Sequence, residues 1–205
     1  RRFGKTVAAQ TIQAYYDNSC DSHDLFAPYE IARDPSYKEH INKYDVIGLD
    51  VQTFFQFGQD HKTFVERLAM AVRDDLCEKW SSIDGLGEMT LADAIATVHI
   101  KAGTKFVFVI DEWDAVFRYY PKDDALQKKW IHFLRDMFKQ AAMNPCVALV
   151  YMTGILPIKK YKTQSSLNQF FEYTMLRPLE LEKYVGFLPA EVDALCEKFD
   201  MDRAE

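Results

Sequence analysis

The first six residues, Arg1-Arg2-Phe3-Gly4-Lys5-Thr6, have the types and spacing of the second half of a phosphate-binding loop, G-x-x-x-x-G-K-[ST]. In such a loop the lysine contacts the β- and γ-phosphates of a nucleotide, and the hydroxyl that follows it binds Mg²⁺. The first glycine of the pattern would precede residue 1, so an ordinary surface Gly-Lys-Thr is the alternative. The rest of the chain decides between the two interpretations.

Two adjacent carboxylates, Asp111 and Glu112, follow the apolar run 106–110. A short run of β-branched and aromatic residues is typical of a strand buried on both faces, which indicates a parallel sheet covered by helices. Open α/β sheets bind ligands at the C-terminal ends of their strands. We therefore expect Asp111 to hold Mg²⁺ and Glu112 to orient and deprotonate an attacking water. The alternative is a polar strand end followed by a capped turn.

Thr153 follows another apolar run, 146–152, and is itself followed by Gly154. In the P-loop ATPases whose catalytic glutamate lies on a strand of its own, the residue at this strand tip contacts the γ-phosphate or the attacking water. We expect this role for Thr153. The alternative is that Thr153 and Gly154 only form a turn.

Two further groups of side chains have two interpretations each. Three lysines beyond Gly154 would either contact phosphates or, as we favour, form a solvated face: Lys159, Lys160 and Lys162. Three aromatic residues would either stack on a base or, as we favour, pack in the core or against a partner: Phe54, Phe55 and Phe57.

The elements that position these residues follow from hydrophobic periodicity. We expect strands over 44–51, 105–111, 146–153 and 172–176. We expect helices over 7–16, 62–80, about ten residues from residue 90, 125–142 and 189–199. Thr63 and Glu66 have the spacing of a capping box, and Thr90 with Asp93 marks a helix start. The polar segment 18–43 is expected to be a connection with one short helical turn, and 118–124 a loop.

Composition narrows the class of protein. The chain has 205 residues, of which 48% are hydrophobic and 27% charged, with a net charge of −6. This balance is typical of globular proteins, and the charge gives no indication of nucleic-acid binding, although it does not exclude it. No apolar run is long enough to span a membrane. The four cysteines are widely spaced and without a C-x-x-C pair, and three of them lie in or beside apolar patterns. We therefore expect these three to be small buried thiols, which suits a reducing cytoplasm.

The chain resembles the predicted AAA-ATPase family, mostly bacterial proteins that often carry a C-terminal PD-(D/E)XK nuclease-like domain. The resemblance spans nearly the whole chain, and its motifs are Arg1-Arg2-Phe3-Gly4-Lys5-Thr6, Asp111-Glu112-Trp113-Asp114, Thr153-Gly154-Ile155, Ser166-Leu167-Asn168, Tyr184-Val185-Gly186-Phe187-Leu188 and Ala190-Glu191-Val192. Trp113 stands where the family usually has tyrosine. No nuclease signature occurs before residue 205.

The resemblance implies an α/β fold, a P-loop NTPase three-layer α/β/α sandwich with a parallel sheet of order 5-1-4-3-2. Strand 1 would precede residue 1 and is therefore absent from this chain. Residues 1–188 would form the AAA-ATPase-like core, truncated at its N-terminal end. Residues 189–205 would begin a helical lid or a following domain.

The expected function is Mg²⁺-dependent ATP binding and hydrolysis, with ATP preferred over GTP because of the resemblance alone. Residues 2–6 would bind the nucleotide: Arg2, Phe3, Gly4, Lys5 and Thr6. Thr6 and Asp111 would bind the metal, and Lys5, Glu112 and Thr153 would act in catalysis. Arg118 and Arg177 are arginine-finger candidates by position only, and surface residues otherwise.

Two alternatives to this function stay open. One is a nucleotide-dependent switch with little turnover, and the other is a fold that has lost nucleotide binding. The expected setting is cytoplasmic, with no membrane contact. The partners implied are ATP and a nuclease-like or other effector domain, and a homo-oligomer is compatible with the resemblance.

Overall fold

The protein is described here by a computed structural model, which covers residues 4–56, 60–157, 167, 169–174, 177, 179–184 and 186–202. The chain divides into two compact units. One comprises Lys5–Gln169, and the other comprises Arg1–Gly4 together with Phe170–Glu205. The division expected from the sequence, a core over 1–188 and the start of a lid over 189–205, stays a prediction.

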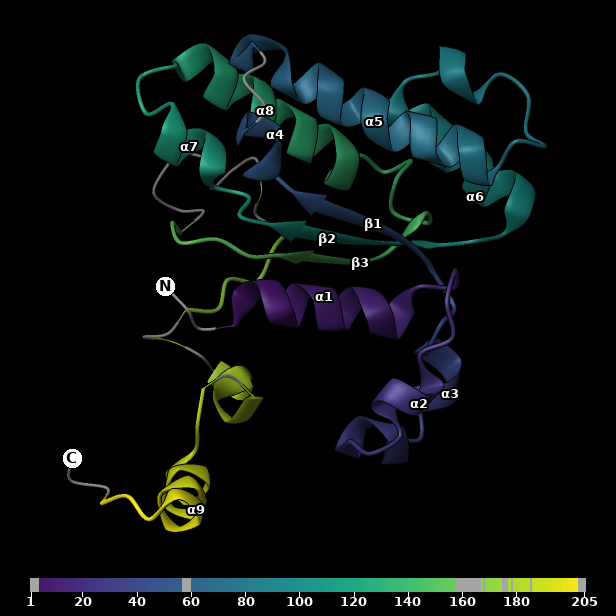
Figure 1. Ribbon diagram of the computed structural model, residues 1–205. Helices are drawn as coiled ribbons and strands as arrows, with labels where there is room; N and C mark the ends of the chain where they lie inside the picture. The colour runs from purple at the N-terminus through teal and green to yellow at the C-terminus, as the bar shows by residue number, and fades with distance from the viewer. Residues whose placement is uncertain are drawn as a thin grey trace. The chain divides into compact units, whose positions relative to one another are not determined.

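A parallel sheet lies at the centre of the larger unit (Figure 1). Within the described residues it has three strands, β1 (Asp45–Asp50), β2 (Phe106–Asp111) and β3 (Val147–Met152), in the order β1-β2-β3. The register pairs Asp50 with Asp111 and Ile110 with Met152, so the three C-terminal ends meet at one edge. The α/β class and the parallel pairing of these three strands are as predicted, whereas the order 5-1-4-3-2 stays a prediction.

The burial of each strand follows from its place in the sheet. All six residues of β2 are buried, as expected for the central strand of a parallel sheet covered on both faces. In β1 buried residues alternate with more exposed ones, and β3 is mostly half-buried. Within the described residues β3 pairs only with β2, so its other edge is open.

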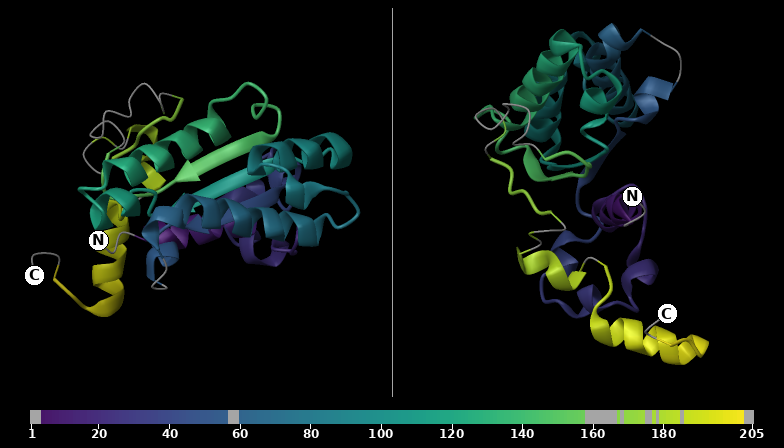
Figure 2. Two further views of the ribbon diagram at one scale, coloured as in Figure 1. Left: turned by 90° about the horizontal axis from the view of Figure 1, so that it is seen from above. Right: turned by 90° about the vertical axis from the view of Figure 1, so that its left-hand side faces the viewer.

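Helices cover both faces of the sheet (Figures 1 and 2). On one face lies α1 (Lys5–Tyr16), whose Ala9 packs against Val107 and Val109 of β2. The opposite face carries α5 (Phe64–Lys79), α6 (Leu91–Ala102) and α8 (Asp124–Phe138). The ring of Phe108 meets that of Phe138 edge-on, with 5.0 Å between centroids. Each long predicted helix of this unit is therefore present.

The aromatic residues after β1 join the core. Phe55, in the short helix α4 (Thr53–Gln56), stacks on the fully buried Phe64 with 4.5 Å between ring centroids. Phe54 and Trp130 also contact Phe64, edge-on. Packing in the core is thus the interpretation that the structure supports for Phe54 and Phe55, whereas Phe57 lies outside the described residues.

The connection 18–43 contains more structure than predicted. It forms α2 (His23–Phe26), a 3₁₀ helix (Glu30–Arg33) and α3 (Tyr37–His40) instead of one helical turn. Phe26, Tyr37 and Ile41 bury their side chains with Tyr15 of α1 in a small cluster. These apolar residues are too few to give a periodic pattern, yet together they fix three short turns.

Helix ends were predicted less accurately. Thr90 caps α6 as expected, since its Oγ1 accepts from the backbone N–H of Asp93. The capping box at Thr63 is wrong, because the Thr63 side chain makes no cap and Glu66 pairs with Lys129. A 3₁₀ turn (His61–Thr63), capped by Asp60, precedes α5 instead.

Two more segments differ from the prediction. Helix α8 ends at Phe138 and not at residue 142, since the chain turns before Pro145 to enter β3. Part of the expected loop 118–124 belongs to the short helix α7 (Ala115–Tyr119). This helix places Arg118 on an ordered element, which becomes important at the candidate site.

In the smaller unit, α9 (Pro189–Phe199) has the predicted bounds and begins with a proline, whose fixed φ suits a first helical turn. A 3₁₀ helix spans Leu179–Tyr184. The predicted strand 172–176 is wrong where it is described. Thr174 makes only an isolated antiparallel bridge to Arg177, and no neighbouring strand among the described residues extends it.

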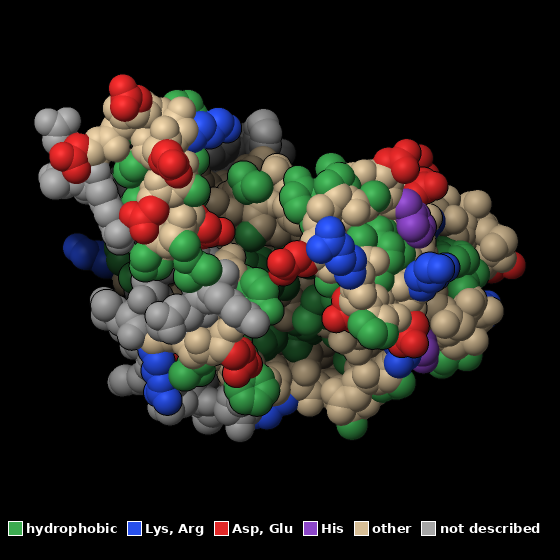
Figure 3. Space-filling view, turned by 90° about the horizontal axis from the view of Figure 1, so that it is seen from below, with side chains coloured by type: hydrophobic (Ala, Val, Ile, Leu, Met, Phe, Trp, Pro, Cys, Tyr) green, Lys and Arg blue, Asp and Glu red, His purple; other side chains and the backbone are tan. Residues whose placement is uncertain are grey.

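Two surface properties bear on function. No helix in the described part of the chain combines the length and the apolar character that a membrane span requires. On the face seen in Figure 3, acidic and basic side chains are interspersed among the residues drawn in colour.

Candidate functional site

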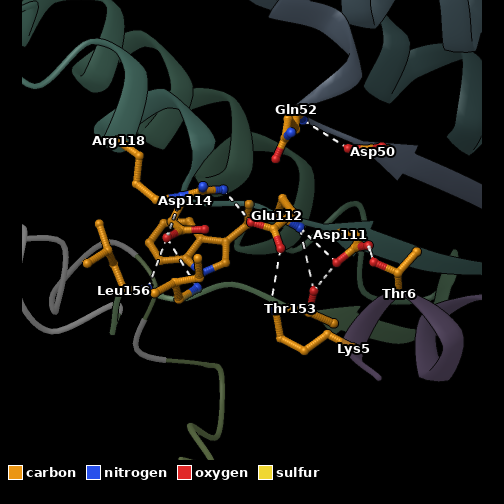
Figure 4. Close-up of polar contacts among 12 residues, drawn as sticks. Lys5, Thr6, Asp50, Gln52, Asp111, Glu112, Asp114, Arg118, Thr153 and Leu156 are labelled. Carbon is orange, nitrogen blue, oxygen red and sulfur yellow. Dashed lines mark hydrogen bonds and ion pairs between the residues drawn. The ribbon is translucent and has the colours of Figure 1, made fainter. Parts of the chain in front are cut away.

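Residues from the two motifs meet where β2 and β3 end and α1 begins (Figure 4). The Thr6 hydroxyl donates a 2.6 Å hydrogen bond to Oδ2 of Asp111, across 105 residues of sequence. The Lys5 ammonium lies 3.4 Å from Oε1 of Glu112. The hydroxyl and the amine of the first motif thus each contact one carboxylate of the second.

Thr153 completes the polar cluster from the tip of β3. Its hydroxyl donates to Oδ1 of Asp111, the oxygen that Thr6 does not contact. Its backbone continues the ladder, because Thr153 N–H donates to Ile110 and its carbonyl accepts from Trp113 at 2.9 Å each. Asp111 and Thr153 are only 6% and 7% exposed, so these contacts are shielded from water.

Asp111 is a buried carboxylate that hydrogen-bond donors surround. It accepts hydrogen bonds from two hydroxyls and, at 3.0 Å, from the backbone N–H of Glu112. Within the described residues no Lys or Arg forms an ion pair with it. A buried charge that protein groups only partly compensate can be balanced by a bound cation.

Glu112 has an unusual backbone. Its φ is 53°, in the left-handed region that residues other than glycine seldom adopt. Such a conformation costs about 1–3 kcal/mol and persists only where its surroundings impose it. It directs the side chain toward Lys5, which contacts Oε1, and toward Arg118, which contacts Oε2. The glutamate therefore lies between two cations.

Asp114 and Arg118 belong to the cluster, although their contacts were not predicted. Asp114 is fully buried, and Nε of Arg118 lies 3.2 Å from its Oδ2. Asp114 directly precedes α7 and Arg118 lies within it, four residues further on, a spacing at which opposite charges commonly pair. That spacing was the sequence signal for the pair. Arg118, an arginine-finger candidate by its position only, thus contacts Glu112.

The backbone before α1 fits a close approach to a ligand. Gly4 has a φ of 72°, a conformation for which glycine has no steric penalty. The first turn of α1 contains no acidic residue of its own, and the positive end of its helix dipole favours a bound anion. Arg2 and Phe3, and the three lysines Lys159, Lys160 and Lys162, lie outside the described residues. Arg177 belongs to the other unit.

The residues present fit a magnesium ion that is held partly by a nucleotide. No group of three or more His, Cys, Asp or Glu side chains gathers at a metal-binding distance in the described ranges. Mg²⁺ bound to nucleotide needs no such group, because it takes one or two carboxylates together with phosphate oxygens and waters. Thr6 and Asp111 supply the hydroxyl and carboxylate oxygens that this arrangement requires.

The charge of Asp111 also affects its neighbour Tyr151 on β3. Burial raises the pKa of the Tyr151 hydroxyl above its ordinary value, and the negative charge of Asp111 raises it further. Tyr151 therefore stays neutral near pH 7 and adds no second negative charge beside Asp111.

Comparison with known proteins agrees with this geometry. The family model described as "Predicted AAA-ATPase" matches residues 1–163, a span that includes Lys5, Thr6, Asp111, Glu112 and Thr153. Searches of the curated proteins and of the solved structures found no match. The matched family implies nucleotide binding, with a divalent metal, and ATPase activity as its predicted reaction. Because the match covers most of its length, this chain belongs to the predicted AAA-ATPase family.

Proposed function

We propose that this chain binds Mg·ATP at the cluster described above and hydrolyses it. The observation that carries the proposal is the hydrogen bond from Thr6 to Asp111. It joins the two halves of a nucleotide site, which are 105 residues apart in sequence, through the two oxygen donors that would share one Mg²⁺. The family match supports the same function.

In this proposal the residues at the start of α1 bind the phosphates. The backbone N–H groups of residues 2–6 and the N-terminus of α1 face the polyphosphate. Lys5 is within 3.4 Å of Glu112, so it exchanges this contact for the β- and γ-phosphates when nucleotide binds. Thr6 and Asp111 hold the metal, which would neutralise charge on the transferred phosphoryl group.

Glu112 is the general base in the proposed reaction. Its carboxylate lies next to Lys5, and therefore next to the proposed position of the γ-phosphate, where it can accept a proton from the attacking water. Thr153 places a hydroxyl beside Asp111, and we assign it to contact the γ-phosphate or the water. These parts act together, since phosphoryl transfer depends on positioning and charge stabilisation.

A second candidate function is a nucleotide-dependent switch with little turnover. The observation that favours it is the state of Glu112, whose two oxygens are engaged by Lys5 and Arg118. A carboxylate held in this way must be released before it can activate water. Slow release would give a protein that binds ATP and hydrolyses it rarely.

The larger assembly is proposed from the family. The edge of β3 with which no described strand pairs would pair with a strand from before residue 1, which would give the 1-4-3-2 part of the order 5-1-4-3-2. Strand 5, expected at 172–176, is not formed where that segment is described. The ATPase would gate an attached effector, such as a nuclease-like domain, and a homo-oligomer is compatible with this role. All four cysteines are free thiols, which is compatible with the cytoplasm, but only Cys146 is buried and not three of them as expected.

Calorimetry with Mg·ATP tests the proposal. The parent protein should bind, and Lys5→Ala should lose binding because the phosphates lose their cation. Lys128→Ala, an exposed lysine of α8, is the matched control and should bind as the parent does. If the Lys5→Ala variant binds Mg·ATP as tightly as the parent, the phosphate-loop assignment is wrong.

A further inference from the structure

Arg118 and Asp114 have no part in the reaction proposed above, yet they connect its components. Asp114 precedes α7 at the position where a side chain usually caps a helix, but it makes no such hydrogen bond. Its Oδ2 instead accepts from the backbone N–H groups of Ile155 and Leu156, at 3.2 and 2.9 Å. The carboxylate thus fastens the loop after β3 to the turn after β2.

The turn after β2 and the loop after β3 also pack closely against each other. A Cβ on Gly154 would lie 2.6 Å from the Trp113 ring and 2.8 Å from Oδ1 of Asp114. Such distances are not found in real structures, so only glycine fits here without displacing the indole or the carboxylate. Thr153, directly before this glycine, is therefore fixed relative to Asp114.

Arg118 links Asp114 to Glu112. Its Nε lies 3.2 Å from Oδ2 of Asp114, and its terminal nitrogen NH2 donates to Oε2 of Glu112. The Arg118 side chain is only 22% exposed, and that of Glu112 only 16%, so water screens their pairing little. The planar guanidinium can hold two carboxylates in a fixed relative orientation.

Lys5 and Arg118, the two cations beside Glu112, have different roles in the proposed function. Lys5 must move to the phosphates, which removes its contact with Oε1. Arg118 has no such second partner in the proposed site and can keep its contact with Oε2. When nucleotide is bound, the orientation of Glu112 then depends on Arg118.

We infer that Arg118 is a positioning residue for Glu112, and that Asp114 holds Arg118 in place. This inference rests on the proposed function, because it concerns the orientation of the proposed base. In this role Arg118 acts through Glu112 and not directly on the phosphates. It fixes the direction of the Glu112 carboxylate and ties it to the loop that carries Thr153.

The first test compares turnover with nucleotide affinity. Arg118→Met should lower kcat about 10–100-fold, the range found when a supporting residue of a site is lost. The Kd for Mg·ATP should stay within about twofold of the parent value, because Lys5, Thr6 and Asp111 are unchanged. Arg135→Met, an arginine of α8 away from the cluster, is the matched control and should leave both quantities unchanged.

Two more variants separate positioning from a general structural role. In a Glu112→Gln background, Arg118→Met should lower kcat no further, since the orientation of a base that is already lost has no effect. Arg118→Lys should recover part of the activity, and it also retains a cation beside the buried Asp114 if Arg118→Met fails to fold. A full kcat in Arg118→Met, or an equal loss in both backgrounds, would overturn the inference.

A measurement without nucleotide separates this inference from the proposed function. The Tm shifts of Arg118→Met and Glu112→Gln should be non-additive in the double variant, because the two side chains are in contact. Additive shifts would overturn the inference even if the enzyme hydrolyses ATP. If the parent does not hydrolyse ATP but the Tm shifts are non-additive, the proposed catalysis fails and the positioning contact is supported.

Discussion

The sheet has a buried aspartate at each of its two ends, and the two differ in how their charge is balanced. Asp45 begins β1 and is 3% exposed, and Asp111 ends β2 and is 6% exposed. Each accepts a short hydrogen bond from a threonine, Thr104 at 2.5 Å for Asp45 and Thr6 at 2.6 Å for Asp111. Asp45 also forms an ion pair with Lys79, whereas no such pair reaches Asp111 within the described residues.

The difference distinguishes a structural contact from a candidate ligand site. We call the edge of the sheet with Asp45 the structural end, and the edge with Asp111 the ligand end. At Asp45, Lys79 neutralises the charge and also donates to Asn18 at 2.8 Å, so the end of α5 is fastened to the sheet. At Asp111 the described partners are two hydroxyls and one backbone N–H, which orient the carboxylate and compensate its charge only in part. Similar residue types thus serve stability at one end and, as proposed, Mg·ATP at the other.

The largest effect is expected at the ligand end. Glu112→Gln should leave ATP binding in place and lower hydrolysis by roughly 10²–10⁴-fold, because a lost general base has effects of this size. Steady-state phosphate release gives the rate, and Glu78→Gln on the exposed side of α5 is the matched control. Equal turnover in the parent and Glu112→Gln would exclude the proposed ATPase function and favour the nucleotide-dependent switch.

A smaller effect is expected at the structural end. Asp45→Ala should lower the free energy of unfolding by about 1–3 kcal/mol, because Thr104 loses its acceptor and Lys79 its counter-ion. Urea denaturation measures the change, and Asp75→Ala on α5 is the control. A loss of free energy of unfolding no larger than that of the control would show that the contacts of Asp45 do not stabilise the fold.

The smallest effect is expected on the surface, at the ion pair of Glu66 with Lys129. Lys129 lowers the pKa of the exposed Glu66 below its ordinary value. A lowered carboxylate pKa contributes stability above the unfolded-state pKa, and this contribution disappears as the pH falls through the lowered value. Glu66→Gln should therefore cost only about 0.2–1 kcal/mol at pH 7, and nothing in strong acid. A cost that persists in strong acid would assign the effect to packing.

The sequence predicted the ligand end better than the structural end. The sequence analysis assigned five residues to one nucleotide site, and the structure brings them together: Lys5, Thr6, Asp111, Glu112 and Thr153. The reason is that parallel strands bring their C-terminal ends to one edge, so residue types at strand ends suffice to predict a site. The catalytic and binding roles of these residues stay predictions.

Side-chain directions were harder to predict. The Arg118 bridge depends on α7, a helix of five residues that is too short for periodicity to show. Asp45 contacts Thr104 and Lys79, and Lys79 contacts Asn18. These residues have neither a shared motif nor a regular spacing. The expected strand 172–176 has no neighbour to pair with among the described residues, and local sequence could not reveal this.

The most direct test of the difference between the two aspartates is a Mg²⁺ titration of ATP binding in the parent, Asp111→Asn and Asp45→Asn. Calorimetry at a series of Mg²⁺ concentrations gives the Kd for ATP in each protein. The account predicts that Mg²⁺ strengthens ATP binding in the parent and Asp45→Asn, and that this gain is largely lost in Asp111→Asn. An undiminished gain in Asp111→Asn would contradict the account, because Asp111 could not then be the carboxylate that holds the metal.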